Sequence, residues 1–383
     1  MNGPLRIAVP IHSFEPGGVE RVALNLCAAW AAGGVAVTVV LGREDGAMAA
    51  TAPKLDYALE HEPVPTARFE TLWMMWRLYR HLRNNPTDVV FAGGNTYAVV
   101  AVVMKLLLGR HCPPLAIKIS NDLYRMDLPA PARWCYRRWL AVQRRFIDHF
   151  VGMAEPMRAE IAECTGVADD RISIIEDPAL AEGQYQALLA LPRPSGGPRA
   201  LQYLAIGRLS GQKNFANLLS AFALLPADAR LTIVGEGPDR GKLERLANEL
   251  GIAGRLAMPG HTDPAPYLAA ASALVLSSDY EGVPAVVIEA LAAGLPIAGT
   301  DCSVSMGSLL GYGQYGKLVP TRSPERLAEA MEAVLAIPFD PAAARASVAK
   351  FRIAAAATRY RALFAELAAA GWRSGPASGR SPR

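Results

Sequence analysis

The chain alternates short apolar runs of strand length with stretches of helical length. It does so in two series, which are separated by a segment rich in Pro, Gly and Ala. In the first series the apolar runs occur at residues 5–11, 35–42, 88–93, 115–120 and 149–154. Such runs predict buried strands, and strands that alternate with helices form parallel βαβ units. The first half of the chain therefore predicts a doubly wound parallel sheet.

The second series repeats this pattern in the other half of the chain. Strands are expected at 201–207, 230–235, 256–260, 273–278 and 296–300, and helices at 214–225, 239–251, 265–272 and 285–294. The fold class is therefore α/β, with two Rossmann-like domains that face each other across a cleft. In open sheets of this kind, ligands bind beyond the carboxyl ends of the strands.

A chain of 383 residues is longer than one hydrophobic core usually supports. We place an N-terminal Rossmann-like domain at 1–180, a linker at 181–199 and a C-terminal Rossmann-like domain at 200–350. A C-terminal helix at 351–372 is expected to pack back on the N-terminal domain. Residues 373–383 form a polar tail that we expect to be disordered.

Composition excludes several classes of protein. A formal net charge of +4 is too small to indicate a nucleic-acid-binding protein by itself. The five cysteines are scattered without a CxxC spacing, which favours reduced thiols over disulfides or a zinc site. No cluster of metal-ligand type is visible, so we expect neither a metal nor another cofactor.

Neither a signal peptide nor a membrane-spanning segment is predicted. The first apolar run contains Arg6 and has no small-residue cleavage site after it. The longest later run, at 97–108, contains Lys105 and is too short to cross a bilayer. We therefore expect a cytoplasmic protein, either soluble or peripheral on the inner membrane.

Glycine-containing loops follow three of the predicted strands. Gly17 and Gly18 come before the first helix, Gly207 ends the strand at 201–207, and Gly235 and Gly237 follow the next strand. Glycine lets the backbone approach a ligand, and a helix N-terminus favours anionic groups. Plain tight turns explain the same residues equally well. No GxGxxG fingerprint with a following ribose-binding acid is present, which disfavours a nicotinamide-dependent oxidoreductase.

Two cations, Arg208 and Lys213, lie five residues apart where a predicted strand passes through a glycine-containing loop into a helix. An arginine fork and a lysine point charge at this edge could clamp a diphosphate. The alternative is that both are solvated surface cations.

The stretch from Ser277 to Cys302 carries two acids, Glu281 and Glu289, in mostly apolar surroundings. Gly282 and Pro284 predict a turn that opens a helix, so Glu281 lies on the loop and Glu289 within the helix. An unpartnered carboxylate in an apolar helix is costly, so a polar group should meet Glu289. Eight residues exceed the reach of an acid/base pair, so we do not interpret the two glutamates as a glycosidase pair.

Together, "GGVERV", "GRLSGQKN", "LTIVGEGP" and "SSDYEGVPAVVIEALAAGLPIAGTDC" resemble the family 4 glycosyltransferases of the GT-B fold. Glu281 and Glu289 match the EX7E signature of that family, and the S-x-x-E-G-x-P pattern before it matches as well. Several motifs in the right order make the resemblance specific. It covers most of the chain and is strongest from residue 201 to about 330.

The resemblance implies a retaining enzyme with an acceptor-side N-terminal domain and a donor-binding C-terminal domain. Its donor would be a UDP- or GDP-sugar, and its acceptor a saccharide or a lipid-linked sugar in bacterial polysaccharide or glycolipid assembly. Glu281 would bind donor-sugar hydroxyls and Glu289 the ribose. Arg208 and Lys213 would neutralise the leaving diphosphate. The remaining donor-side positions that the resemblance implies are Gly17, Gly18, Gly207, Gly235, Gly237, Ser278, Gly282, Val283 and Pro284.

The chain departs from the family pattern at three places, one of which is the Asn-Pro after the N-terminal domain, which appears here as "EDPAL". Family members often carry a histidine in the N-terminal domain near the donor sugar, where this chain has Asn121 and Asp122. The Gly-Pro-Glu element that often follows the signature is replaced by "CSVSMGSLLG", which has no glutamate. A non-catalytic protein of the same fold, which binds sugar nucleotides or serves as a scaffold, is therefore the alternative hypothesis.

Two segments, 69–85 and 132–150, combine Trp, Tyr and Phe with arginines. They could be amphipathic helices that lie on an anionic membrane. The alternative is that they are ordinary helices, which pack their aromatic side chains on the sheet and point their arginines outward.

Overall fold

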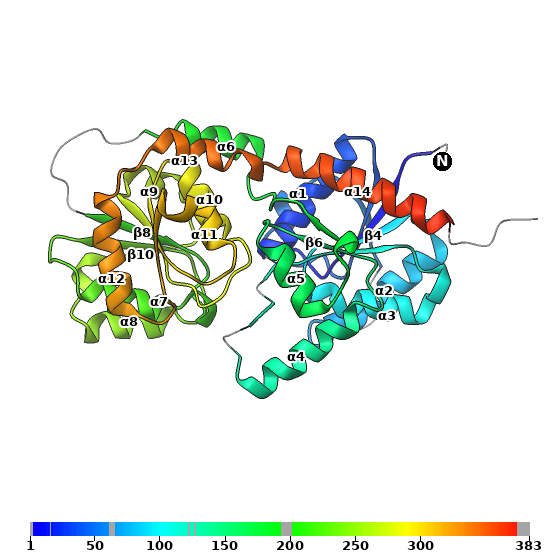
Figure 1. The fold of residues 1–383 in the computed structure, drawn as a ribbon, viewed down its shortest axis with the longest axis horizontal. Helices are drawn as coiled ribbons and strands as arrows, with labels where there is room; N and C mark the ends of the chain where they lie inside the picture. Colours follow the sequence, from blue (N-terminus) through cyan, green and yellow to red (C-terminus); the bar gives the residue numbers. More distant parts are fainter. Residues whose placement is uncertain are drawn as a thin grey trace, which may run out of the picture. The chain divides into compact units, whose positions relative to one another are not determined.

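The computed structural model describes residues 3–15, 17–60, 66–121, 123–125, 128–192 and 201–373. The chain divides into two compact units (Figure 1). The first unit takes its described residues from Met1–Tyr124, Pro129–Pro178 and Ile353–Arg383. The second unit takes its described residues from Arg125–Leu128 and Ala179–Arg352. Both are built as Rossmann-like α/β domains, so the prediction of two such domains is confirmed.

Within the described residues of the first unit, seven strands form one parallel sheet in the order β3-β2-β1-β4-β5-β6-β7. All residues of β4, β5 and β6 are buried, which explains why these strands are apolar apart from Lys118 and His149. The strands are β1 (Arg6–Ile11), β2 (Ala36–Leu41), β3 (Asp56–Ala58), β4 (Val89–Ala92), β5 (Leu115–Lys118), β6 (His149–Gly152) and β7 (Ile172–Ile174).

Helices cover both faces of this sheet. Because parallel crossovers are right-handed, α1 lies on one face, and the helices that follow β3, β4, β5 and β6 lie on the other. The helices are α1 (Gly18–Ala32), α2 (Glu70–Asn84), α3 (Ala98–Leu108), α4 (Ala130–Gln143), α5 (Met157–Thr165) and α14 (Ile353–Arg373). Short 3-10 turns occur at Ala49–Thr51, Asn95–Tyr97, Gly109–His111 and Asp169–Arg171.

The C-terminal helix α14 packs beside α1 on the first unit, as predicted. Trp30 of α1 is fully buried there, and its indole N–H donates to the carbonyl of Ala357 at 3.2 Å. The rings of Phe91, Tyr360 and Phe364 pack edge-on against the indole, with centroids 5.2 to 5.7 Å away. This aromatic cluster ties the end of the chain to a helix near its beginning.

In the second unit, six strands of the described part form a parallel sheet in the order β10-β9-β8-β11-β12-β13. The strands are β8 (Gln202–Ile206), β9 (Arg230–Val234), β10 (Leu256–Gly260), β11 (Ala273–Leu276), β12 (Ile297–Thr300) and β13 (Gly316–Val319). The helices are α6 (Glu182–Leu189), α7 (Phe215–Ala223), α8 (Arg240–Glu249), α9 (Ala265–Ala270), α10 (Ala285–Ala292), α11 (Met306–Leu309), α12 (Pro324–Ala333) and α13 (Pro341–Ser347). Further 3-10 turns occur at Gly211–Lys213, Ala253–Arg255, Gly311–Gly313, Val334–Ala336 and Ala349–Phe351.

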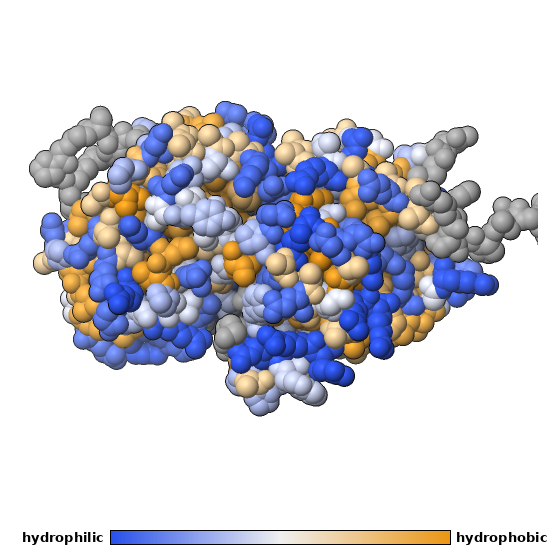
Figure 2. All heavy atoms as spheres, viewed as in Figure 1, coloured by the Kyte–Doolittle hydropathy of each residue, from blue (hydrophilic) through white to orange (hydrophobic). Residues whose placement is uncertain are grey.

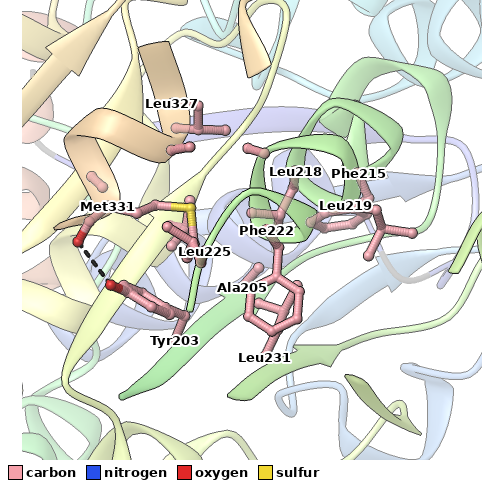
Figure 3. Close-up of a cluster of buried hydrophobic side chains, with 14 of the residues drawn as sticks. Tyr203, Ala205, Phe215, Leu218, Leu219, Phe222, Leu225, Leu231, Leu327 and Met331 are labelled. Atoms are coloured by element: carbon pink, nitrogen blue, oxygen red, sulfur yellow. Dashed lines mark hydrogen bonds between the residues drawn. The ribbon is translucent and has the colours of Figure 1, made fainter. Parts of the chain in front are cut away.

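One buried cluster of this unit lies where α7 and α12 pack on β8 and β9 (Figure 3). The Tyr203 hydroxyl in this apolar cluster has a hydrogen-bond partner, because it donates to the carbonyl of Met331 at 3.0 Å. The labelled members are Tyr203, Ala205, Phe215, Leu218, Leu219, Phe222, Leu225, Leu231, Leu327 and Met331.

The predicted linker at 181–199 is wrong for its first half. Residues Glu182–Leu189 form α6, which belongs to the second unit and packs on α10. Tyr185 and Leu188 are buried on one side of it, an amphipathic spacing hidden by the surrounding Ala, Gly and Pro. Residues 193–199 lie outside the described residues, as do 374–383 of the predicted tail.

Three strands, β3, β7 and β13, were not predicted from the sequence. Each is three or four residues long and lies at an edge of its sheet. A short edge strand contributes too few apolar residues to produce a recognisable run.

Candidate functional site

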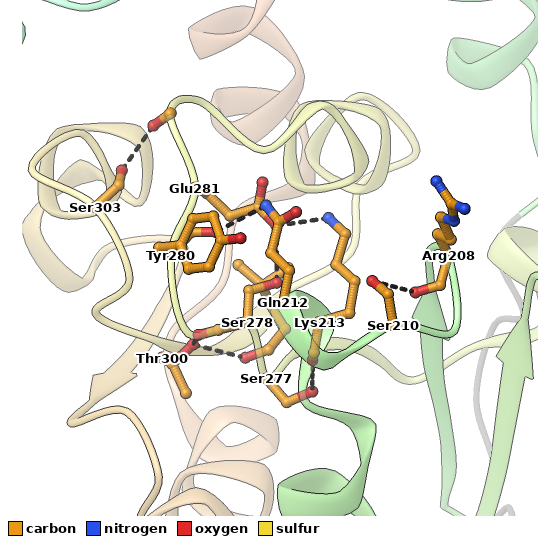
Figure 4. Close-up of polar contacts among 12 residues, drawn as sticks. Arg208, Ser210, Gln212, Lys213, Ser277, Ser278, Tyr280, Glu281, Thr300 and Ser303 are labelled. Atoms are coloured by element: carbon orange, nitrogen blue, oxygen red, sulfur yellow. Dashed lines mark hydrogen bonds and ion pairs between the residues drawn. The ribbon is translucent and has the colours of Figure 1, made fainter. Parts of the chain in front are cut away.

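Most of the sequence-predicted site residues meet at the carboxyl edge of the sheet in the second unit. Strands β8, β11 and β12 are neighbours, and the loops that follow them lie side by side (Figure 4). We call these the β8 loop (207–214), the β11 loop (277–284) and the β12 loop (301–305). Because parallel strands end at the same edge, residues far apart in sequence converge here.

Glu281 is buried at the centre of this edge. Its Oε1 atom accepts hydrogen bonds from Lys213 Nζ at 2.5 Å and from Ser278 Oγ at 2.8 Å. A buried carboxylate is tolerated when a counter-charge and hydrogen bonds offset its lost hydration. These contacts bring Glu281, Lys213 and Ser278 together, and their roles toward a ligand stay predictions.

The β8 and β11 loops are joined by a further set of contacts. The Ser277 hydroxyl donates to the carbonyl of Lys213 at 2.8 Å, and the Gln212 amide donates to the carbonyl of Tyr280 at 3.0 Å. Asp279 accepts from Asn214 at 2.8 Å. These bonds hold the chain around Lys213 against the residues just before Glu281, so they help to position both side chains.

Arg208 lies apart from this arrangement. Its side chain is exposed and forms no hydrogen bond or ion pair with any residue that the structure describes. In Figure 4 it points away from Glu281, whereas Lys213 points toward it. The two cations are therefore not brought together, and the role of Arg208 at a diphosphate stays a prediction.

Glu289 lies in α10 and is buried among apolar residues. A buried carboxylate requires a polar partner. Gln184 of α6 is one, because its Nε2 donates to Glu289 Oε1 at 3.0 Å. Gln184 was missed by the sequence analysis, because it lies in the segment that had been assigned to the linker. The two acids of the signature thus have separate partners.

The glycines after β8 and β9 serve close packing between backbones. A Cβ atom on Gly235 would lie 1.9 Å from the carbonyl oxygen of Gly207, and one on Gly237 would lie 2.3 Å from that of Leu209. Any side chain at either position would push the β8 loop away. Among the described residues these glycines therefore have a structural role, and a direct ligand contact for them is still a prediction.

In the first unit, Gly17 and Gly18 open α1 at the carboxyl end of β1. Behind them lies a polar cluster that the sequence analysis missed. The Tyr97 hydroxyl lies 3.3 Å from Glu20 Oε1 and accepts from the amide N–H of His12 at 3.1 Å. Burial lowers the pKa of His12 and raises the pKa of Glu20, so both are held closer to their neutral forms.

Asn121 follows β5 at the carboxyl edge of the first unit, and Asp122 lies outside the described residues. Among the described residues, no group of three or more His, Cys, Asp or Glu side chains could hold a metal ion.

Family comparisons agree with the sequence motifs. The family described as "Glycosyltransferase Family 4" matches residues 16–178, and the one described as "Glycosyl transferases group 1" matches residues 198–350. Apart from Arg125–Leu128, the first match lies in the first unit, and the second match lies in the second unit.

Two curated relatives align with part of the chain. The lipopolysaccharide core biosynthesis glycosyltransferase LpsE of Rhizobium meliloti is 34% identical over 35% of this chain and 39% of its own length. A Campylobacter jejuni N-acetylgalactosaminyltransferase, named for a diphospho-undecaprenol-linked acceptor, is 31% identical over 34% of this chain and 36% of its own length. The chain thus spans little more than a third of the length of these relatives.

The fold also matches solved structures. That of Anabaena HepE in complex with UDP and glucose superimposes with a TM-score of 0.70 at 15% identity, covering 94% of this chain and all of HepE.

Proposed function

The chain belongs to the family 4 glycosyltransferases, and we propose that it moves a sugar from a nucleotide-diphosphate-sugar donor to an acceptor. The observation that carries this proposal is the Glu281–Lys213 pair at the carboxyl edge of the second unit. In this pair a carboxylate, which can accept from sugar hydroxyls, lies beside an ammonium, which can donate to phosphate oxygens. One ligand with a sugar linked to a diphosphate would use both.

Lys213 is the group suited to the leaving diphosphate. Its ammonium carries three N–H donors, of which Glu281 engages one, and its side chain is 19% exposed. As the bond between sugar and phosphate breaks, negative charge builds up on the phosphate oxygens, and a cation already in position stabilises it. Glu289, held by Gln184, would accept from the ribose hydroxyls.

Backbone amides add to this anion site. The N-terminus of α10 follows Glu281 after a turn at Gly282–Pro284, and the helix dipole is positive there. We propose a retaining reaction, with UDP- or GDP-sugars as the donor class. The HepE complex with UDP and glucose supports a nucleotide-sugar donor in this fold.

We propose a saccharide or lipid-linked acceptor in bacterial surface polysaccharide or glycolipid assembly. The names of the lipopolysaccharide and undecaprenol-linked relatives support this acceptor class.

A Lys213→Met variant tests the diphosphate role. We expect release of the nucleoside diphosphate to slow by about 10²–10³-fold, the usual cost of removing one preorganised donor to a developing anion. The measurement is nucleoside diphosphate release from a panel of UDP- and GDP-sugars, with saccharide and undecaprenol-linked acceptors. Lys242→Met, a cation exposed on α8, is the matched control and should leave the rate unchanged.

Two results would contradict the proposal. Unchanged turnover in the Lys213→Met variant would show that Lys213 does not stabilise the leaving diphosphate. Donor binding without release by the wild-type protein, across all donors and acceptors, would indicate the non-catalytic alternative.

We also propose that the first unit contacts an anionic membrane through α4. Residues 130–145 hold no acidic residue, and Trp134 is 64% exposed in the first half of the helix. Figure 2 shows a strongly hydrophilic surface over α4. Basic side chains next to an exposed tryptophan suit the interface of an anionic bilayer. The arginines of this segment are Arg133, Arg137, Arg138, Arg144 and Arg145.

Helix α2 fits the membrane interpretation less well. Trp73, Met74 and Leu78 are buried, as the alternative hypothesis expected, and the Trp73 indole donates to the carbonyl of Gly42 at 2.9 Å. Against that hypothesis, Arg77 is buried as well and Trp76 is exposed. No helix in the described part of the chain is both long and apolar enough to cross a membrane.

Removing two of the α4 charges should weaken vesicle binding. At about 1 kcal/mol for each basic residue, Arg137→Gln/Arg138→Gln should bind vesicles of phosphatidylglycerol and phosphatidylcholine roughly 30-fold more weakly. Co-sedimentation at low salt gives the affinity. Lys242→Gln/Arg326→Gln, which removes two exposed charges from α8 and α12, is the control. Equal loss in both variants, or in neither, would contradict a role for α4.

A further inference from the structure

Two serine hydroxyls of the β12 loop converge on one backbone carbonyl. Ser303 Oγ lies 2.7 Å from the carbonyl oxygen of Gly282, and the Ser305 hydroxyl donates to the same oxygen. The two hydroxyl oxygens are 2.6 Å apart, and the amide N–H of Ser305 donates to Ser303 Oγ at 3.2 Å. Both serines are buried. We call Ser303 and Ser305 the serine pair.

Either serine of the pair can hold the Gly282 carbonyl without the other, as the number of hydroxyl protons shows. Each hydroxyl carries one proton, so two protons serve three oxygen–oxygen contacts. Either both hydroxyls donate to Gly282, or one donates to the other, which then donates to Gly282. In each arrangement at least one proton reaches the carbonyl, so loss of a single hydroxyl leaves the other able to hold it.

Holding this carbonyl also orients the next amide. No peptide bond in the described part of the chain is cis, so the N–H of Val283 points opposite to the carbonyl of Gly282. It therefore points away from the serine pair. On the other side of Gly282, the amide N–H of Glu281 donates to the carbonyl of Cys302 at 3.0 Å. The β12 loop thus fixes the peptide plane between Gly282 and Val283 and the one between Tyr280 and Glu281.

The amide N–H groups of Gly282 and Val283 have no acceptor among the described residues. Both residues are buried. A buried N–H group without an acceptor is costly, so a site of this kind suits an anionic oxygen.

We propose that Ser303 and Ser305 are positioning residues. They hold the Gly282 carbonyl so that the Val283 N–H faces a phosphate oxygen of the donor. This inference rests on the proposed function, because the anionic oxygen belongs to the nucleotide-sugar. The serine pair comes from the stretch in which the chain lacks the family's Gly-Pro-Glu element.

The test compares the affinity of the protein for a nucleoside diphosphate with its affinity for the corresponding nucleoside. Calorimetry measures both affinities, with UDP against uridine and GDP against guanosine, and we call their ratio the diphosphate preference. Ser303→Ala and Ser305→Ala should each change this preference by less than about threefold. Ser303→Ala/Ser305→Ala should lower it roughly 10-fold, more than the product of the single effects, with nucleoside binding unchanged. A melting curve checks that each variant is folded.

Two further double variants test whether a loss of diphosphate preference comes from misfolding. Ser303→Cys/Ser305→Cys fills similar space with weak donors and should lose the same preference. Ser303→Thr/Ser305→Ala keeps one hydroxyl and should behave as the wild type.

Three outcomes separate the hypotheses. A double variant with the wild-type diphosphate preference overturns the positioning role. An equal loss of nucleoside and diphosphate affinity also overturns it, because that result indicates general damage to the site. A wild-type protein that binds neither UDP nor GDP contradicts the proposed function itself.

Discussion

Glu281→Gln is expected to lower the rate of sugar transfer by at least about 10²–10³-fold while the protein stays folded. The wild-type carboxylate accepts from both Lys213 and Ser278 on one oxygen. Glutamine keeps the shape and one acceptor oxygen but removes the negative charge. The amide would no longer hold Lys213 with a charge-assisted bond, and it would bind sugar hydroxyls more weakly.

The assay is nucleoside diphosphate release with the donor that the wild-type protein turns over best. Glu329→Gln removes an exposed carboxylate on α12, which is paired with Arg326, and should leave the rate unchanged. Folding should persist in Glu281→Gln, because the Lys213 side chain is 19% exposed and water can reach the charge left without its partner. Turnover at the wild-type rate in the folded variant would show that Glu281 has no role in sugar transfer.

Trp30→Ala should lower the free energy of unfolding of the first unit by about 3–5 kcal/mol, the usual cost of deleting a large aromatic side chain from a core. The indole fills the space between α1, β4 and α14, and its N–H satisfies the carbonyl of Ala357. The variant leaves a cavity beside Phe91, Tyr360 and Phe364. Since α14 depends on this cluster, we expect it to become accessible to protease before the rest of the first unit.

Urea unfolding followed by circular dichroism measures the loss, and limited proteolysis reports on α14. Trp134→Ala is the matched control, because the same substitution at a site 64% exposed should cost less than about 0.5 kcal/mol. Equal destabilisation by both variants would show that the aromatic cluster does not hold α14.

Much of the second unit could be predicted because its signals are local. Each strand expected between residues 201 and 300 overlaps an observed strand, from β8 to β12. The turn after Glu281 was predicted for the same reason, since Gly282 and Pro284 restrict the backbone by their own chemistry. The short edge strands and α6 carry weaker local patterns and were missed.

The candidate site was predicted in its residues but not in its contacts. Glu281 and Lys213 were expected near one ligand, and their direct ion pair was not foreseen. Gln184 and the serine pair were missed altogether, because no spacing in the sequence shows that they meet Glu289 and Gly282.

The sequence by itself determined where most of the longer strands lie, that there are two α/β domains, and which family the motifs match. These follow from periodicity and from the backbone preferences of a few residues, which act over short stretches of chain. Only the tertiary structure decided that Lys213 rather than Arg208 meets Glu281, that α6 supplies a partner to Glu289, and that two serines hold the Gly282 peptide. Such contacts join residues that are close in space and distant in sequence. They depend on how parallel strands bring their loops to one edge, and no local pattern records that.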